Sequence, residues 1–325
     1  MQATAVAHPN IALVKYWGKL PGEGNVPAVG SLSVTLAGMR TRTTVTFDAT
    51  LGMDAFQLNG RAASPEQTRR VSDFLDRVRH RSATNRHAQV VSDNDFPTGA
   101  GLASSASGFA ALALAATGAA GLHLTPQELA ALACQGSGSA ARSIFGGYVV
   151  MQPGATPAGD GGTEQLATPE HWPLKVLVAI TSEAAKPVGS TRGMRQTQET
   201  SPYFAAWVDA ASADLAAARH AVAQRNFADL AIVGERSCLK LHGLVMSADP
   251  GLLYWSGTTV DLMHRVRAWR ARGVPVFFTI DAGPQVKVLC PPDVADQVRD
   301  WLVAVPGVQR VLTCALGPGA HLVPA

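Results

Sequence analysis

Hydrophobic and polar residues alternate in several short segments of the chain, and in other segments hydrophobic residues recur at helical spacing. Alternating, β-branched segments predict strands at residues 31–36, 41–47, 89–92, 148–151, 175–181, 276–280 and 286–289. Helical spacing predicts helices at residues 65–80, 103–118, 126–135, 203–224, 226–236, 258–272 and 292–303. This mixture of strands and helices is typical of an α+β fold.

Local signals place one helix start and one loop. Thr125, Pro126 and Glu128 have the order of an N-cap, a first-turn proline and a capping-box acid. Residues 153–169 are rich in Pro, Gly and Thr and predict a long surface loop after a hairpin strand. The chain of 325 residues is long enough for two domains, and we expect the change of domain soon after the strand at 175–181.

Composition narrows the class of protein. Apolar residues make up 47% and charged residues 16% of the chain, which fits a globular protein and argues against disorder. The net charge is only +3, and the single basic cluster, residues 77–81, is interpreted as a solvated helix face. We therefore expect no nucleic acid partner.

Cysteines and the N-terminus bear on location. Cys134, Cys238, Cys290 and Cys314 form no CxxC pair, so we expect reduced thiols rather than a zinc site or a disulfide framework, as in the cytoplasm. The N-terminus lacks the pattern of a signal peptide. The most apolar stretch, residues 109–122, is too short to span a bilayer, so it predicts a buried helix and no membrane contact.

A glycine- and serine-rich segment, FPTGAGLASSASG at 96–108, leads into an apolar helix. Helix N-termini present N–H groups and a partial positive charge, so such a segment can hold phosphates. Serine hydroxyls at this position can bind a phosphate oxygen or its Mg²⁺. No GxxxxGK[ST] sequence occurs, and the alternative interpretation is an ordinary Gly-rich turn with serine caps.

Two further segments combine glycine or a strand end with charge. In QGSGSAARS, 135–143, a helix starting near Ser139 would place Arg142 on the same face, where it could hold a carboxylate or phosphate; the alternative is a flexible linker. In TIDAGPQ, 279–285, Asp281 follows an apolar run and could orient or deprotonate a hydroxyl; the alternative is a turn-initiating aspartate.

The opening segment, HPNIALVKYWGK at 8–19, carries Lys15 and Lys19 with two aromatic residues between them. Two lysines near the start of a domain are usually surface charge. The interleaved aromatic residues favour an ordered segment instead.

In their order along the chain, these segments resemble mevalonate diphosphate decarboxylases of the GHMP kinase superfamily. The resemblance extends from about residue 3 to residue 315. It rests on PNIALVKYWGK (9–19), SLSVTL (31–36), DFPTGAGLASSASG (95–108), GSGSAARS (136–143), KPVGSTRGM (186–194), ETSPYF (199–204) and IDAGPQVKV (280–288). It implies a two-domain GHMP-kinase-like fold, with mixed sheets flanked by helices. The active site would lie in the cleft between a nucleotide-binding domain, 1–183, and a C-terminal domain, 184–325.

The resemblance also implies roles for individual residues. Asp281 would orient or deprotonate the 3-hydroxyl of the substrate, and Arg142 would hold the carboxylate that leaves as CO₂. Two other residues match catalytic positions, Asn10 near these groups and Lys186 near the ATP phosphates. Further positions match the substrate pocket: Tyr16, Lys19, Ser137, Gly138, Ser139, Ser190 and Met194. The ATP phosphate loop would include Gly99, Gly101, Ser104 and Ser105, with Ser105 also contacting the metal.

The implied reaction is ATP-dependent decarboxylation of mevalonate 5-diphosphate to isopentenyl diphosphate, with Mg²⁺, in a cytoplasmic homodimer. One alternative is a related kinase or decarboxylase of the superfamily that acts on mevalonate or its monophosphate, and another is a ligand-binding sensor without turnover. The chain departs from the family pattern at Val29 and Gly30, which replace Asn and Ser. Arg192 is shifted by one place, so no role is carried over to it.

Overall fold

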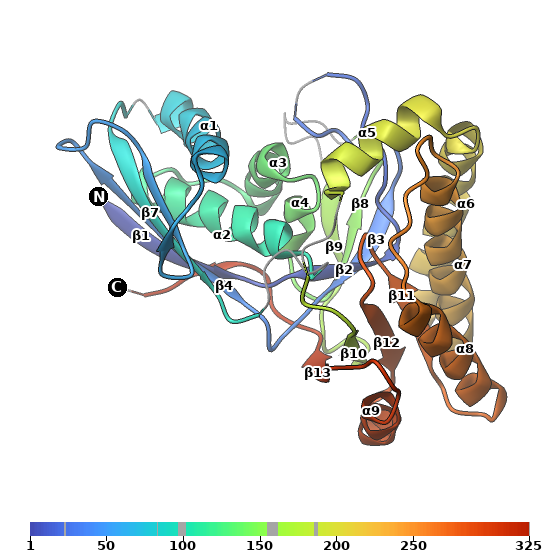
Figure 1. Cartoon of the computed structure of the whole chain (residues 1–325). Coiled ribbons are helices and arrows are strands. Elements are labelled where there is room, and N and C mark those ends of the chain that lie inside the picture. The colour runs from blue at the N-terminus through green and yellow to red at the C-terminus, as the bar shows by residue number, and fades with distance from the viewer. Residues whose placement is uncertain (23, 83, 97–101, 155–161, 185–187, 325) are drawn as a thin grey trace.

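The computed structural model describes residues 1–22, 24–82, 84–96, 102–154, 162–184 and 188–324, and its strands pair into three sheets. The first sheet contains, in spatial order, β14 (His321–Leu322), β1 (Gln2–Ala7), β4 (Thr41–Asp48), β7 (His87–Asn94), β5 (Ala55–Leu58) and β6 (Arg61–Ala62). Because β14 pairs antiparallel with β1, the two ends of the chain meet at one edge of this sheet (Figure 1).

The other two sheets lie nearer the middle of the molecule. One has the order β2 (Asn10–Val14), β3 (Ser31–Thr35), β8 (Tyr148–Met151) and β9 (Thr163–Ala167). The last has the order β11 (Phe277–Ile280), β12 (Val286–Cys290), β10 (Lys175–Ile180) and β13 (Arg310–Ala315). β2, β3, β8, β11 and β12 are buried along their whole length, so these sheets are covered by other elements on both faces.

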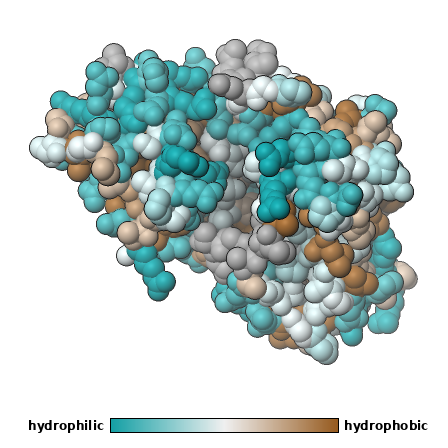
Figure 2. Space-filling model, turned by 45° about the horizontal axis from the view of Figure 1, so that its top comes forward, coloured by the Kyte–Doolittle hydropathy of each residue, from teal (hydrophilic) through white to brown (hydrophobic). Residues whose placement is uncertain are grey.

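Helices cover the sheets in two groups (Figure 1). The first group is α1 (Pro65–Ser82), α2 (Ser104–Ala119), α3 (Pro126–Gly136) and the short α4 (Ala140–Ser143). The second group is α5 (Ser190–Thr200), α6 (Phe204–Gln224), α7 (Phe227–Met246), α8 (Gly257–Ala271) and α9 (Ala295–Val303). On the face shown in Figure 2, hydrophilic side chains dominate the half that carries α1, and hydrophobic ones are more frequent on the other half.

Packing of α2 and α7 determines where the site forms. α2 is hydrophobic nearly all round and packs on β1 and β4, with α3 and α4 on its other side. α7 packs against both β2 and β11. The chain segments that follow β2 and β11 are therefore brought side by side. Lys15 and Asp281, which lie in these two segments, are 266 residues apart in the sequence.

The predicted α+β mixture and the predicted helices are confirmed, with differences at particular elements. The helix expected at 226–236 continues to Met246, and the one expected at 292–303 begins with a 3₁₀ turn, Pro292–Val294, before α9. The prediction of a loop throughout 153–169 was wrong, since β9 pairs with β8 there. The Pro- and Gly-rich composition at the start of this segment favoured a loop, whereas its second part pairs with β8 as a short strand.

One prediction about charge was also wrong. Arg79, in the basic cluster at 77–81, is buried rather than solvated. It makes two hydrogen bonds of 3.0 Å to the buried carboxylate of Asp54 and a shorter one of 2.6 Å to Asp76. A buried arginine is tolerated because its charge is paired in this way. None of the described helices is long and apolar enough to cross a membrane.

Candidate active site

Asp281 lies directly after β11, between two buried lysines. Its Oδ1 is 2.6 Å from Nζ of Lys15, and its Oδ2 is 3.1 Å from Nζ of Lys287. The lysine side chains are 1% and 0% exposed, whereas 27% of the Asp281 side chain is exposed. The carboxylate is thus the end of this triad that a ligand can reach.

The two lysines determine the ionisation of Asp281. Burial by itself would raise the pKa of the carboxyl group, but the charges of Lys15 and Lys287 and their hydrogen bonds outweigh burial and lower the pKa well below its usual range. Asp281 is therefore a carboxylate at neutral pH. It can accept a hydrogen bond from a hydroxyl, but it is a weaker base than an isolated aspartate.

Arg142 lies in α4, directly beside β2 and β3. Its Nε donates to Oδ1 of Asn10 at 3.3 Å, and its Nη1 donates to Oγ of Ser31 at 2.9 Å. The amide of Asn10 in turn donates to the carbonyl of Ser139 at 3.0 Å and to the hydroxyl of Ser143 at 2.8 Å. Asn10 therefore fixes both the orientation of Arg142 and the loop that precedes α4.

The charge of Arg142 is left without an acidic partner within the described part of the chain. The side chain is only 2% exposed, and burial lowers the pKa of the guanidinium to about 10, which still leaves it charged at neutral pH. Asp281 lies close enough for its charge to stabilise the arginine cation. A buried cation held by neutral groups is suited to binding an anion such as a carboxylate.

Tyr16 lies between Arg142 and the serine-rich loop, residues 137–139. Its ring centroid lies 5.4 Å from Cζ of Arg142, a cation–π distance. Its hydroxyl is buried and has no hydrogen-bond partner among the described residues, and burial raises its pKa. A Cβ on Gly138 would lie 2.2 Å from this hydroxyl, so glycine is required there for the tyrosine to reach this position.

Lys19 follows Tyr16 in the same chain segment, and its ammonium group is held by Asn25. Its ammonium donates to Oδ1 of Asn25 at 2.6 Å, and burial lowers its pKa. The hydroxyls of Ser137 and Ser139 approach one another at 3.4 Å on the adjoining loop. Cation, hydroxyls and phenol are the donor types that bind a phosphate or diphosphate.

α5 completes this region and carries two further predicted residues. Ser190 is its first residue, and Met194 is buried. The helix is tied to the lysine segment because the indole of Trp17 donates to Oγ1 of Thr197 at 2.8 Å. Ser190 and Met194 are thus held on an element that packs against the Tyr16–Lys19 segment.

The start of α2 is the predicted phosphate-binding element, and its first residues are Ser104 and Ser105. No cap hydrogen bond from the side chain of Ala103 or any other described residue is present at this end, and the first turn contains no acidic residue. Phe109, one turn further, packs so closely on Gly136 that a Cβ there would lie 2.0 Å from its ring. The helix therefore starts beside the serine loop. Gly99, Gly101 and Lys186 lie outside the described residues.

This end of α2 fits a magnesium nucleotide. Helix N–H groups and serine hydroxyls are donors for phosphate oxygens. Magnesium bound to a nucleotide takes most of its ligands from phosphates and water, so one hydroxyl such as that of Ser105 is a suitable protein contact.

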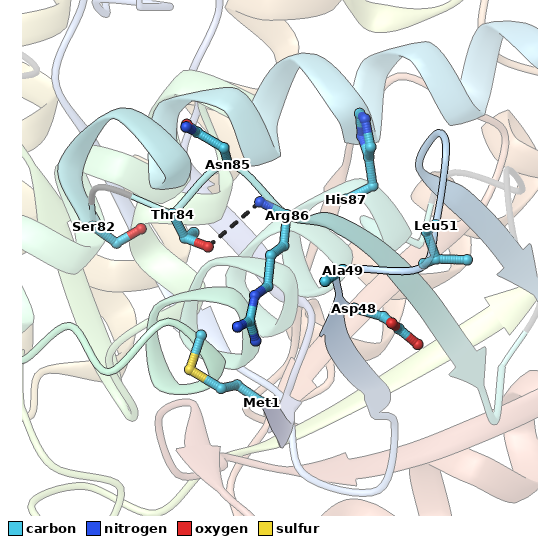
Figure 3. Close-up of a pocket in the computed structure, with 9 residues that line it drawn as sticks. All are labelled: Met1, Asp48, Ala49, Leu51, Ser82, Thr84, Asn85, Arg86 and His87. Carbon is cyan, nitrogen blue, oxygen red and sulfur yellow. Dashed lines mark hydrogen bonds between the residues drawn. The ribbon is translucent and has the colours of Figure 1, made fainter.

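A separate surface hollow of about 590 Å³ lies near the N-terminus (Figure 3). It opens between the turn after β4 and the turn before β7, and contains none of the predicted site residues. It is lined by Met1, Asp48, Ala49, Leu51, Ser82, Thr84, Asn85, Arg86 and His87.

Three residues that contact Asp281 or Arg142 were not assigned from the sequence. Lys15 was placed in a segment expected to be ordered, because of the two aromatic residues that follow it, but it was given no role in the site. Lys287 is the one charged residue in the otherwise apolar β12, and that pattern could have indicated a buried, paired lysine. Ser31 carries no such signal, because its contact with Arg142 depends on how two strands pack.

The divergent Gly30 has a packing explanation. A Cβ at this position would lie 2.6 Å from Cδ2 of Leu215 and 3.2 Å from Cδ of Pro153. α6 therefore packs directly against the start of β3. The same packing fixes the backbone that presents Ser31 to Arg142.

Family models match both halves of the chain. Residues 7–163 match the Diphosphomevalonate decarboxylase-like N-terminal domain, and residues 176–315 match the Mevalonate 5-diphosphate decarboxylase C-terminal domain. The chain is 32% identical to a diphosphomevalonate decarboxylase of Candida albicans, in an alignment that covers 98% of this chain and 96% of the relative.

Solved structures of this kind share the whole fold. The mevalonate diphosphate decarboxylase from Enterococcus faecalis superposes with a TM-score of 0.90 at 38% identity, over 100% of this chain and 99% of the other. A structure described as MDDEF in complex with MVAPP, AMPPCP and magnesium superposes with a TM-score of 0.92 at 39% identity, with the same coverage. These matches bear out the expected two-domain α+β fold.

Proposed function

Given that the chain belongs to the diphosphomevalonate decarboxylase family, we propose that it catalyses the ATP-dependent decarboxylation of mevalonate 5-diphosphate. The products are isopentenyl diphosphate, ADP, phosphate and CO₂, as in isoprenoid biosynthesis by the mevalonate pathway. The observation that carries the proposal is the buried Arg142, which has no acidic partner in the described chain and lies within the field of Asp281. The substrate carries a carboxylate and a hydroxyl that match these two groups.

In the first step, Asp281 accepts a hydrogen bond from the 3-hydroxyl of the substrate. The hydroxyl oxygen attacks the γ-phosphorus of ATP, the bond to the β-phosphate oxygen breaks, and ADP leaves. The low pKa of Asp281 makes orientation its main contribution, and it takes the proton late, when the new P–O bond has acidified the hydroxyl. Phosphoryl transfer through a loose transition state requires little basic assistance.

Charge stabilisation in this step comes from the start of α2 and, as the family resemblance implies, from Lys186. Ser104 and Ser105 would hold the ATP phosphates there, in the loop that includes Gly99 and Gly101. Ser105 would contact the Mg²⁺ that comes with the nucleotide, and the ion would neutralise part of the charge on the phosphates.

In the second step, the 3-phosphate leaves with the electrons of the C–O bond, and a carbocation-like centre develops. The bond to the carboxylate carbon then breaks, its electrons form the new double bond, and CO₂ departs. Arg142, oriented by Asn10 and Ser31, holds the carboxylate in place for this cleavage. Its partners are neutral, so its charge is available to the substrate.

The remaining pocket residues bind the diphosphate end of the substrate. The hydroxyl of Tyr16, which has no hydrogen-bond partner among the described residues, lies against Gly138 of the serine loop. The ammonium of Lys19 is linked through Asn25 to the end of α3, just before that loop. Two phosphate groups give these donors enough acceptors. Ser190 and Met194 would contact the same end of the substrate, because α5 is tied to the Tyr16–Lys19 segment through Trp17 and Thr197.

The direct test is incubation with ATP, Mg²⁺ and carboxyl-labelled mevalonate 5-diphosphate, followed by measurement of ADP and labelled CO₂. We expect one CO₂ for each ADP. Asp281→Asn should lower both products at least about 100-fold while the substrate still binds, because the shape is kept and the charge is removed. Equal turnover by the variant would contradict the assignment of Asp281.

Parallel incubations separate the other functions. ADP without CO₂ would identify a kinase that stops at the phosphorylated product. Faster turnover of mevalonate or its monophosphate would identify a relative with a different substrate. Binding without ADP formation would identify a sensor.

We further propose that the enzyme works in the cytoplasm as a homodimer, as the family resemblance implies. The cysteines at 134, 238, 290 and 314 are buried free thiols, which fits a reducing compartment. Light scattering at several protein concentrations tests the dimer.

A further inference from the structure

Asn25 joins two sides of the diphosphate pocket with one side chain. Its Oδ1 accepts a hydrogen bond of 2.6 Å from the ammonium of Lys19. Its Nδ2 donates to the carbonyl oxygens of Cys134 and Gln135, at 2.9 and 3.0 Å. These carbonyls belong to the last turn of α3, immediately before Ser137. One amide therefore connects the lysine with the loop that carries the phosphate-binding serines.

The backbone around Asn25 is built to present this amide. Asn25 has a φ of 58°, in the left-handed region that asparagine tolerates better than most residues. The N–H of Leu20 donates to the carbonyl of Val26 at 2.8 Å, and Lys19 forms an antiparallel bridge with Pro27. The segment returns on itself, so Asn25 faces the side chain of Lys19.

Lys19 is also fixed from the opposite side. Its N–H donates to Oε1 of Gln198 at 3.2 Å, and its carbonyl accepts from Nε2 of Gln198 at 2.6 Å. This reciprocal pair ties the backbone of Lys19 to α5. The lysine backbone is thus held by Gln198, and its ammonium by Asn25.

A neutral amide is the suitable group at this position. Lys19 forms no ion pair with an acidic side chain of the described chain, so its positive charge remains available to a phosphate anion. A carboxylate at position 25 would neutralise Lys19, face two carbonyl oxygens at about 3 Å without a donor, and repel the diphosphate. Asparagine holds the ammonium in place without neutralising it.

We propose that Asn25 is a positioning residue for the diphosphate of the substrate, a conclusion that rests on the proposed function. It sets the ammonium of Lys19 against the end of α3, so that the lysine and the serine loop bind the diphosphate as one preorganised unit. The resulting preorganisation lowers the cost of binding. It contributes to the affinity for the diphosphate end and not to the chemistry at Asp281.

Two substitutions separate charge from geometry. Asn25→Asp keeps the shape but neutralises Lys19 and repels the substrate, so we expect the KM for mevalonate 5-diphosphate to rise at least about tenfold. Asn25→Gly keeps the left-handed backbone and removes only the side-chain hydrogen bonds, so we expect a rise of about three- to tenfold. In both variants kcat and the KM for ATP should stay within about threefold of the wild type.

Asn59 provides the matched control. It is also an asparagine in the left-handed region, with a φ of 51°, but it lies in the turn between β5 and β6. Asn59→Asp should leave the KM for the substrate unchanged. A rise like that of Asn25→Asp would mean that the kinetic change comes from strain at a left-handed aspartate, and it would overturn the proposal.

Calorimetric titration with inorganic pyrophosphate tests the subsite without turnover. We expect the wild-type protein and Asn59→Asp to bind pyrophosphate, and Asn25→Asp to bind it at least about tenfold more weakly. Equal binding by Asn25→Asp, or no binding by the wild type, would overturn the role of Asn25 whichever reaction the enzyme catalyses. A wild type that binds pyrophosphate but releases no CO₂ would instead contradict the proposed function alone. If the Asn25 variants had a lower melting temperature but an unchanged KM for the substrate, Asn25 would contribute only to stability and the proposal would be wrong.

Discussion

Gly138→Ala is the sharpest single test of how the pocket is built, because it adds one methyl group at a defined contact. The new Cβ would lie 2.2 Å from the hydroxyl oxygen and 2.8 Å from Cζ of Tyr16. Real carbon contacts are far longer, so either the tyrosine or the loop must move. The tyrosine ring is itself buried and lies beside Arg142.

The magnitude follows from the cost of overpacking. An extra methyl group in a well-packed site costs about 1–3 kcal/mol. An unfolding entropy of about 2.1 cal/mol/K per residue gives ~0.7 kcal/mol/K for the 325 residues, so the melting temperature should fall by about 1.5–4.5 °C. Moving the Tyr16 hydroxyl away from the diphosphate removes one charge-assisted hydrogen bond, so the KM for the substrate should rise by about tenfold.

Steady-state kinetics and thermal unfolding on the same preparation provide the assay. Gly243→Ala is the control, because Gly243 lies in α7 and the added carbon would have no described atom outside the local helix backbone within 4 Å. It should stabilise the protein by about 0.5–1 kcal/mol without changing KM. Combining Gly138→Ala with Tyr16→Phe removes the hydroxyl that collides, so stability should be partly restored while the KM stays high. Wild-type melting temperature and KM in Gly138→Ala would refute the packing argument.

Two other predictions concern the charged groups. A lysine at position 142 cannot keep the hydrogen bonds to both Asn10 and Ser31. We therefore expect Arg142→Lys to lower kcat about 100-fold or more, with a smaller change in KM. A variant that is less stable but fully active would contradict the catalytic role of Arg142. Because folding lowers the pKa of Asp281, its ionised form stabilises the protein fully at any pH above the usual aspartate pKa. This stabilisation is lost as the pH falls from that value through the lowered pKa of the folded protein. Lys287→Met removes one of the two cations beside Asp281 and should raise that pKa. The acid limb of the kcat/KM profile should then move to higher pH than in the wild type, and an unmoved limb would exclude Asp281 as the titrating group.

Local sequence determined the secondary structure that surrounds the site. The capping box at Thr125 and Glu128 forms as predicted and starts α3 at Pro126. The apolar, alanine-rich stretch after residue 103 becomes the buried helix α2 because no face of it is polar. These features depend on neighbours within one or two helical turns, so periodicity and capping residues reveal them.

The order of motifs identified the family and the main candidate residues, but their contacts required the tertiary structure. Asp281 stood out as an aspartate at a strand end, whereas its pairing with Lys15 and Lys287 and its lowered pKa could not be read from spacing. Asn25, in a segment with no recognised motif, was missed for the same reason.

Only the tertiary structure determined which charged side chains are buried and which groups they contact. Lys15 and Asp281 are 266 residues apart, yet α7 packs on both strands that precede them and brings the two side chains to 2.6 Å. The energy of a charge depends on its distance to other charges and on its exposure to water. Neither quantity is a property of a residue and its sequence neighbours, so the sequence by itself determined the groups available for chemistry and the tertiary structure determined their ionisation and orientation.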